Sequence, residues 1–213
     1  MALSMRILLI PLIATIFTGV CAQNIDIRLL RDVNLNRSKS LDGTFNAITN
    51  SAGPVSFAVP LVCWGIGRFS GNEKLEQQGV ISGSAIILTV TVSYLTKYTV
   101  NRSRPYKTYP DIQPFSSDNT PSFPSNHTSV AFSAATSFSL AYPRWYVIVP
   151  SYTWASVVAY SRLHLGEHYP SDVLAGAIIG AGSAFVCYKL NNWIMRSYRS
   201  VFPLHKTKQQ SGY

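Results

Sequence analysis

Two residues with catalytic potential, His168 and Asp172, lie four positions apart in a polar stretch between two apolar ones. On one helix face, a carboxylate at this spacing can accept a hydrogen bond from one imidazole nitrogen and fix the ring tautomer. The other nitrogen is then free as a nucleophile or base. Because Pro170 lies between them, we expect a helix to begin near it and the pair to meet at the helix start. Taken alone, the spacing is also typical of an ordinary pair on a helix surface.

Groups that suit an oxyanion lie in other parts of the chain. Three basic side chains could converge on one anion: Lys97, Arg104 and Arg162. Ser125 and the amides around Asn126 precede an expected helix start near His127, where further donors would face an anion. Phosphoryl transfer needs a nucleophile, a proton donor for the leaving oxygen and positive charge around the equatorial oxygens. These residue types therefore suit phosphoryl transfer without a set of metal ligands.

Apolar segments are expected to position these groups. They span residues 54–67, 77–96, 128–143, 145–160 and 173–188. The second is long enough, as a helix, to cross about 30 Å of hydrocarbon, and the last three are rich in Gly, Ala and Ser, which suits close helix packing. We therefore predict an all-α fold, a polytopic membrane bundle of about five core helices. The alternative is a soluble domain with buried helices.

The composition is low in charge but strongly basic. Of the 213 residues, 47% are hydrophobic and 13% are charged, against about a quarter charged in soluble domains. The net charge of +9 is compatible with nucleic acid, anionic lipid or a phosphate-bearing substrate. No nucleic-acid-reading motif accompanies it, so we expect no nucleic-acid partner. Cys63 and Cys187 lie in apolar runs and are interpreted as packing residues.

The two ends of the chain predict its orientation. Residues 1–22 are typical of a secretory signal peptide or, if uncleaved, of an anchor helix. We expect an extracytoplasmic lead-in at residues 23–53, the helical bundle at 54–190 and a basic cytoplasmic tail at 191–213, as the positive-inside rule favours. This orientation places the polar clusters on the periplasmic or extracytoplasmic side of a cell inner membrane.

Together the clusters form an ordered pattern, Lys-x6-Arg-Pro, then Pro-Ser-x-His, then Ser-Arg-x5-His-x3-Asp. It resembles the three-part signature of the type 2 phosphatidic acid phosphatase and vanadium haloperoxidase superfamily, over roughly residues 54–190. The residues that carry it are Lys97, Arg104, Pro105, Pro124, Ser125, His127, Ser161, Arg162, His168 and Asp172. One departure is Asn126, where the family commonly has Gly. Asn tolerates unusual backbone angles better than most residues, so the donors can keep their geometry.

The resemblance implies a metal-independent, all-helical phosphatase without a cofactor. By this analogy His168 attacks phosphorus and forms a phosphohistidine, while Asp172 orients His168. His127 would protonate the leaving group and then activate water. The groups implied to hold the phosphoryl oxygens are Lys97, Arg104, Ser125, Asn126 and Arg162.

The resemblance leaves several classes open. We favour the membrane lipid phosphatase branch, because the last motif leads directly into the apolar segment 173–188. Such a phosphoric monoester hydrolase would act on a phospholipid, lipid A or a polyprenyl phosphate or diphosphate, with the bilayer as its other partner. The alternatives are a soluble secreted acid phosphatase of broad specificity and, less favoured for a chain of this size, a vanadate-dependent haloperoxidase. The intact signature argues against a non-catalytic scaffold, and the oligomeric state is not indicated.

Four ionisable residues lie close to the motif positions in the sequence, but their types and spacing indicate no specific role. His164 and Glu167 match no motif position and are expected to be solvated or to pack. Arg102 and Lys107 are interpreted as polar loop residues or as contacts to a substrate headgroup.

Overall fold

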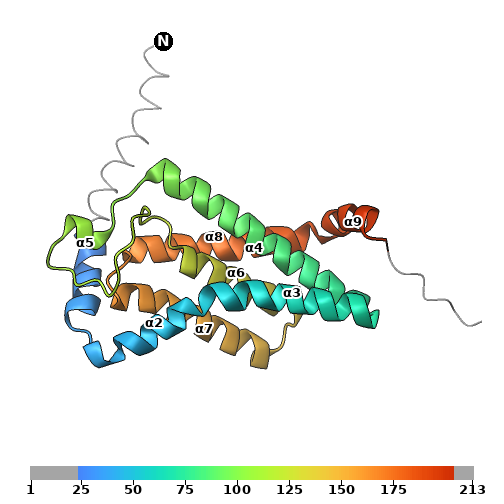
Figure 1. Cartoon of the computed structure of the whole chain (residues 1–213), viewed down its shortest axis with the longest axis horizontal. Helices are drawn as coiled ribbons and strands as arrows, with labels where there is room; N and C mark the ends of the chain where they lie inside the picture. The colour runs from blue at the N-terminus through green and yellow to red at the C-terminus, as the bar shows by residue number, and fades with distance from the viewer. Residues whose placement is uncertain (1–23, 204–213) are drawn as a thin grey trace, which may run out of the picture.

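The computed structural model describes residues 24–203, a part of the chain that contains helices and loops but no β-strand (Figure 1). A first helix covers residues 24–35. The elements after it are η1 (Lys39–Leu41), α2 (Asp42–Asn50), α3 (Ala52–Ser70), α4 (Glu73–Val100), α5 (Pro105–Thr108), α6 (Asn126–Ala141), α7 (Trp145–His164), α8 (Pro170–Lys189) and α9 (Asn191–Val201). Each predicted apolar segment lies largely in one of the long helices α3, α4, α6, α7 and α8, so the predicted all-α bundle is confirmed. The expected signal or anchor segment, residues 1–22, lies outside the described residues.

The outer surface of the bundle is apolar. Three helical stretches of the described residues are long and apolar enough to cross a membrane: Lys39–Ser70, Glu73–Thr108 and Pro170–Lys189. Large aliphatic side chains on them point outward, and Leu61, Ile87 and Ile178 are 65%, 67% and 64% exposed. Such a surface is unfavourable in water and is what a bilayer requires. These features agree with a membrane protein.

Helix α6 lies at the centre of the bundle, where it contacts α3, α4, α7 and α8. Its buried face carries small residues, among them Ala131, Ala134 and Ala135. On the neighbouring helix α8, a Cβ at Gly180 would lie 2.0 Å from the backbone oxygen of Ser129. Only glycine permits this approach, so the two helices pack backbone against backbone. The contact fixes the start of α6 relative to the start of α8.

The helix directions bring all three motifs to one end of the bundle. Helices α4 and α7 end there and α6 and α8 begin there, at the left in Figure 1, while α9 lies at the opposite end. Asn101 ends α4 in a left-handed conformation (φ 48°), which Asn adopts more readily than most residues. Gly166 (φ 70°) turns the chain between α7 and α8, where a Cβ would lie 2.7 Å from Asn34 Nδ2.

Residues 24–53, which the sequence predicts as an extracytoplasmic lead-in, pack against the bundle. Ile27 and Leu30 pack in one buried cluster with Ile112 and Tyr169. Thr49, in α2, is fully buried. These short helices cover the polar end of the bundle, where the apolar side chains of the connecting loops would otherwise meet water. The segment therefore shares a core with the bundle and can contribute to the site.

Candidate active site

Hydrogen bonds join the three motifs to one another. Lys97 Nζ donates to the carbonyl of Pro124 at 3.0 Å, which links the first motif to the second. The amide of Ser125 donates to the carbonyl of Asp172 at 3.1 Å, which links the second to the third. Arg104 Nη1 donates to the carbonyl of Glu167 at 3.2 Å and links the first to the third. Segments far apart in the sequence therefore form one compact site.

Lys97 lies in the last turn of α4 and is only 1% exposed. Besides the Pro124 carbonyl, its ammonium donates to the carbonyl of Pro121 at 2.6 Å. An ammonium group has three donors, so one remains for a further acceptor. The two carbonyls hold the charge in place without neutralising it.

Arg104 directly precedes α5, and Pro105 begins that helix. Its Nε donates to the Thr120 carbonyl at 2.9 Å, and its Nη2 pairs with Asp118 Oδ2 at 2.6 Å. Burial acts to raise the pKa of Asp118, but the Thr120 amide and the Arg104 charge outweigh it and lower that pKa below its usual value. The guanidinium is thus held rigidly by a loop that the motif does not include.

Arg162 is buried in the last turn of α7. Its Nη1 donates to Thr49 Oγ1 at 3.1 Å, and its Nη2 pairs with the carboxylate of Glu167. Its Nε is buried and has no acceptor within the described residues. A buried N–H without an acceptor is costly, and a phosphoryl oxygen is the kind of acceptor that a guanidinium favours.

His168 and Asp172 meet at the start of α8, which begins at Pro170 as predicted. His168 Nδ1 lies 3.5 Å from Asp172 Oδ2. The same carboxylate oxygen accepts hydrogen bonds from the Ser122 hydroxyl and from the Tyr169 amide, the latter at 3.0 Å. The carboxylate is therefore fixed beside one ring nitrogen, which leaves the other nitrogen, Nε2, for chemistry.

Burial is the main cause that lowers the pKa of His168 to about 3. Asp172 acts in the opposite direction, while the charge of Arg162 lowers the pKa further. The imidazole is consequently neutral at neutral pH. A nucleophilic histidine requires this state, because a protonated ring has no free lone pair.

Helix α6 begins at Asn126, close to the helix start expected near His127. Ser125 lies directly before it, and the amide groups of a first helical turn have no acceptor within their own helix. Because Asn126 is itself helical, it needs no unusual backbone angle, and its tolerance of such angles is not used here. Its amide can donate to an oxyanion as any residue at this position could. His127 follows it and is partly exposed to a cavity.

Several residues around the site were not expected from the motifs. Arg102 pairs with Asp172, and Glu167 pairs with Arg162. Glu167 and His164 are both buried, so of the two expected roles they have the packing one and are not solvated; His164 Nε2 lies 2.9 Å from Asp42 Oδ1. The sequence feature that could have indicated these contacts is a charged residue beside an apolar stretch. Such a residue needs a partner for its charge when the fold buries it.

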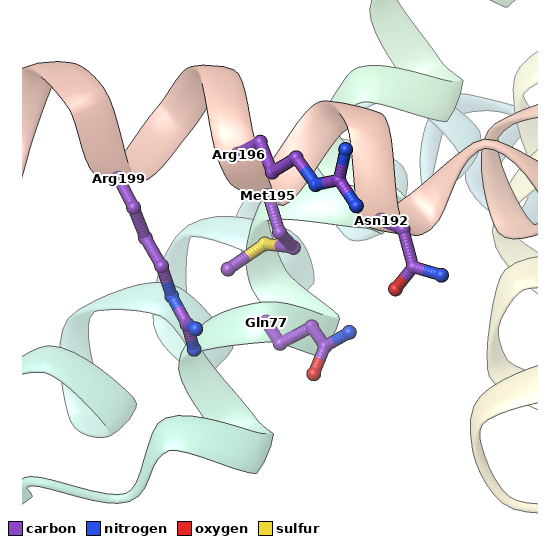
Figure 2. Close-up of a pocket in the computed structure, with 5 residues that line it drawn as sticks. All are labelled: Gln77, Asn192, Met195, Arg196 and Arg199. Atoms are coloured by element: carbon purple, nitrogen blue, oxygen red, sulfur yellow. The ribbon is translucent and has the colours of Figure 1, made fainter.

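A separate pocket lies at the opposite end of the molecule (Figure 2). It has a volume of about 310 Å³ and lies between α9 and the start of α4, lined by Gln77, Asn192, Met195, Arg196 and Arg199. None of these residues belongs to the three motifs. Within residues 24–203, no group of three or more His, Cys, Asp or Glu side chains is arranged to hold a metal ion.

Comparison with known proteins gives relatives over most of the chain. An undecaprenyl-diphosphatase of Sulfolobus acidocaldarius is 26% identical over 87% of this chain and 90% of its own length. A lipid A 1-phosphatase of Porphyromonas gingivalis is 34% identical over 54% of this chain and 24% of its own length.

Two solved structures have the same fold. The crystal structure of Aquifex aeolicus LpxE matches with a TM-score of 0.67 and 26% identity, over 78% of this chain and 95% of that one. A transmembrane PAP2 type phosphatidylglycerolphosphate phosphatase from Bacillus subtilis matches with a TM-score of 0.68 and 25% identity, over 90% of this chain and 96% of that one. The sequence profile of the PAP2 superfamily matches residues 78–196, which contain all three motifs. The predictions of a hydrolase and of a membrane fold are thereby confirmed, and the chain belongs to the PAP2 superfamily.

Proposed function

We propose that the protein hydrolyses a lipid phosphate, a monoester or a diphosphate, through a phosphohistidine on His168. The observation that carries the proposal is the buried Arg162, whose Nε has no acceptor among residues 24–203, in one site with the neutral imidazole of His168. The relatives named undecaprenyl-diphosphatase and lipid A 1-phosphatase support a lipid substrate. The outward apolar surface favours this function over that of a soluble secreted acid phosphatase.

In the first step, His168 Nε2 attacks phosphorus and the bond from phosphorus to the lipid oxygen breaks. Burial and the charges of Arg162 and Arg104 lower the pKa of His127 to about 4, and the negative charge of the bound phosphate acts in the opposite direction and favours the protonated ring. That ring gives its proton to the lipid oxygen, so that the lipid leaves as an alcohol or, from a diphosphate, as a phosphate. Asp172 holds the Nδ1 side of His168 through the transfer. In the second step, His127 takes a proton from water, the hydroxide attacks phosphorus and the P–N bond breaks. Inorganic phosphate and the original two imidazoles are the products.

The non-bridging oxygens carry the negative charge in both steps. Lys97, Arg104 and Arg162 surround them with fixed positive charge, and Ser125 and the Asn126 amide add donors. Because protein groups already orient these cations, little reorganisation is needed when the phosphoryl group arrives. The site then favours the transition state, where charge is most widely spread.

We place the site on the extracytoplasmic side of the membrane. The basic residues Lys189, Arg196 and Arg199 lie in α8 and α9, at the opposite end of the bundle from the motifs. Basic residues near membrane helices favour the cytoplasmic side. The same orientation agrees with a signal or anchor segment at residues 1–22 and with an extracytoplasmic segment at 23–53.

The test is turnover of a lipid phosphate panel by the full-length protein in detergent with EDTA. The panel contains a prenyl phosphate and diphosphate, phosphatidate, phosphatidylglycerol phosphate and lipid A, with release of inorganic phosphate as the readout. We expect hydrolysis of at least one lipid and none by a folded His168→Ala variant. Absence of all hydrolysis, or near-normal activity of His168→Ala, contradicts the proposal.

A second measurement separates the roles of the two histidines. p-Nitrophenyl phosphate has a leaving group that needs no proton, so His127→Ala should still form the phosphoenzyme but hydrolyse it slowly. We expect a burst of about one equivalent of nitrophenol and a trapped phosphoryl group that survives alkali and is lost in acid. A His127→Ala variant that shows no burst of nitrophenol would contradict the proposal that His168 forms the phosphoenzyme before His127 is needed to hydrolyse it.

A further inference from the structure

A cavity of about 290 Å³ adjoins the active site between α3, α4 and α6. Its lining consists of Gly53, Phe57, Val90, Ser93, Tyr94, Asn126, His127 and Val130. His127, the proposed proton donor to the leaving oxygen, is part of its wall. The cavity is therefore placed on the leaving-group side of the phosphate and not among the cations that hold the phosphoryl oxygens.

The wall combines an apolar mouth with polar groups deeper inside. Phe57 and Tyr94 are 47% and 45% exposed, whereas Ser93 is 2% exposed. An exposed aromatic mouth suits the hydrocarbon of a lipid, and a buried hydroxyl suits a polar group near the phosphate. The cavity thus has the polarity profile of a lipid just beyond its headgroup.

Two of the lining residues have a buried polar atom without a partner. Ser93 Oγ and Asn126 Oδ1 are both buried and make no hydrogen bond within the described residues. Buried polar atoms are paired in most proteins, and an unpaired one in a native structure points to a missing partner. That both atoms belong to the wall of one cavity, beside a catalytic histidine, gives them a common explanation.

Ser93 is unusual on its own helix. Other hydroxyls of α4, including Ser84, Thr89 and Thr99, donate to the carbonyl four residues earlier, at 2.7 to 2.8 Å. This bond is the default for a helical Ser or Thr that has no other partner. Ser93 makes no such bond, so its hydroxyl remains available to another molecule.

We propose that Ser93 and Asn126 form a polar subsite that binds a hydrogen-bonding group of the leaving alcohol. The Asn126 side-chain carbonyl accepts from a hydroxyl or amide N–H of the lipid, and the Ser93 hydroxyl donates to or accepts from the same group. This inference rests on the proposed function and adds the substrate class to it. The preferred lipids carry a hydroxyl or an amide close to the phosphate, as glycerol and amino sugar lipids do, whereas a simple alkyl phosphate has no such group.

The test compares two substrates of equal chain length, lysophosphatidate with its free 2-hydroxyl and a plain alkyl phosphate. For the full-length protein in mixed micelles, we expect kcat/KM for lysophosphatidate to exceed that for the alkyl phosphate by about ten-fold, as one additional hydrogen bond would give. In Ser93→Ala and Asn126→Gly this ratio should fall several-fold. Val90→Ala, which removes only apolar lining, should leave the ratio unchanged.

The ratio is the decisive quantity, because Asn126→Gly can alter phosphate binding and so affect both substrates equally. If Asn126→Gly does not fold, Ser93→Ala alone decides. A wild-type protein that hydrolyses both substrates, with a ratio that neither variant changes, overturns the subsite and leaves the proposed function standing. A wild-type protein that hydrolyses no lipid phosphate overturns the proposed function and the subsite together.

Discussion

Arg102 Nη1 donates to Asp172 Oδ1 at 2.8 Å, while the other oxygen of the same carboxylate faces His168. The Arg102 guanidinium also pairs with Asp26 at 2.9 Å and lies 3.8 Å from the centre of the Tyr169 ring. Arg102 therefore holds the Asp172 carboxylate in place, and Asp172 in turn orients His168.

We expect Arg102→Ala to lower kcat about ten-fold with little change in KM, because it loosens Asp172 without touching the phosphate. Arg102→Lys keeps the charge and should restore part of kcat. Initial rates on the best lipid substrate give both constants. Arg31→Ala, which breaks an exposed pair with Asp111, is the matched control and should behave as wild type. A rise in KM alone would show that Arg102 contacts the substrate instead.

The Arg162–Glu167 pair is expected to be important for stability. Both side chains are 5% exposed, and removal of one partner from a buried pair typically costs about 3–5 kcal/mol. Glu167→Ala should therefore unfold well before wild type in a thermal or denaturant scan in detergent. Glu73→Ala breaks a pair with Arg199 whose side chains are 42% and 62% exposed, and it should cost less than about 1 kcal/mol. Equal losses of unfolding free energy in Glu167→Ala and Glu73→Ala would contradict the stabilising role of the Arg162–Glu167 pair.

The pH dependence of stability should reflect His168. Its pKa is lowered to about 3 in the folded protein, against about 6.5 in an unfolded chain. The unfolded state therefore binds a proton first, so the contribution of His168 to stability is complete above pH about 6.5 and is lost as the pH falls toward 3. Denaturation at a series of pH values should show a shallower decline for His168→Gln than for wild type. Identical slopes would mean that His168 is not buried as a neutral ring.

The contact between α6 and α8 should tolerate no added methyl group. An alanine Cβ at position 180 would meet the Ser129 oxygen at 2.0 Å, so Gly180→Ala must separate the helices and shift the turn that carries His127. We expect a loss of at least about 1–3 kcal/mol and reduced turnover. Gly182, in the same helix, has no atom of the described residues within 4 Å of an added Cβ. Gly182→Ala should be neutral or stabilising by up to about 1 kcal/mol, and a similar loss in both variants would contradict the packing argument.

The local sequence was sufficient to predict the long helices and to identify the motifs. The apolar segments predict α3, α4, α6, α7 and α8 because a membrane bundle needs long, uncharged helices. Pro170 marks the start of α8 because a proline suits the first helical turn. The spacing of Lys97, Arg104, Ser125, His127, Arg162, His168 and Asp172 indicates the superfamily, since these residues depend on one another for a single reaction.

The fold class, the family and the set of reactive side chains thus follow from the residues and their spacing. The partners that hold those side chains are found only in the folded molecule: Asp26 and Arg102 beside Asp172, and Thr49 and Glu167 beside Arg162. Partners of this kind come from distant segments, and burial requires a partner for each charge without specifying where in the chain it lies. The vacant hydrogen-bonding capacity of Ser93 and Asn126 is equally invisible in sequence, because it depends on how α3, α4 and α6 pack around one cavity.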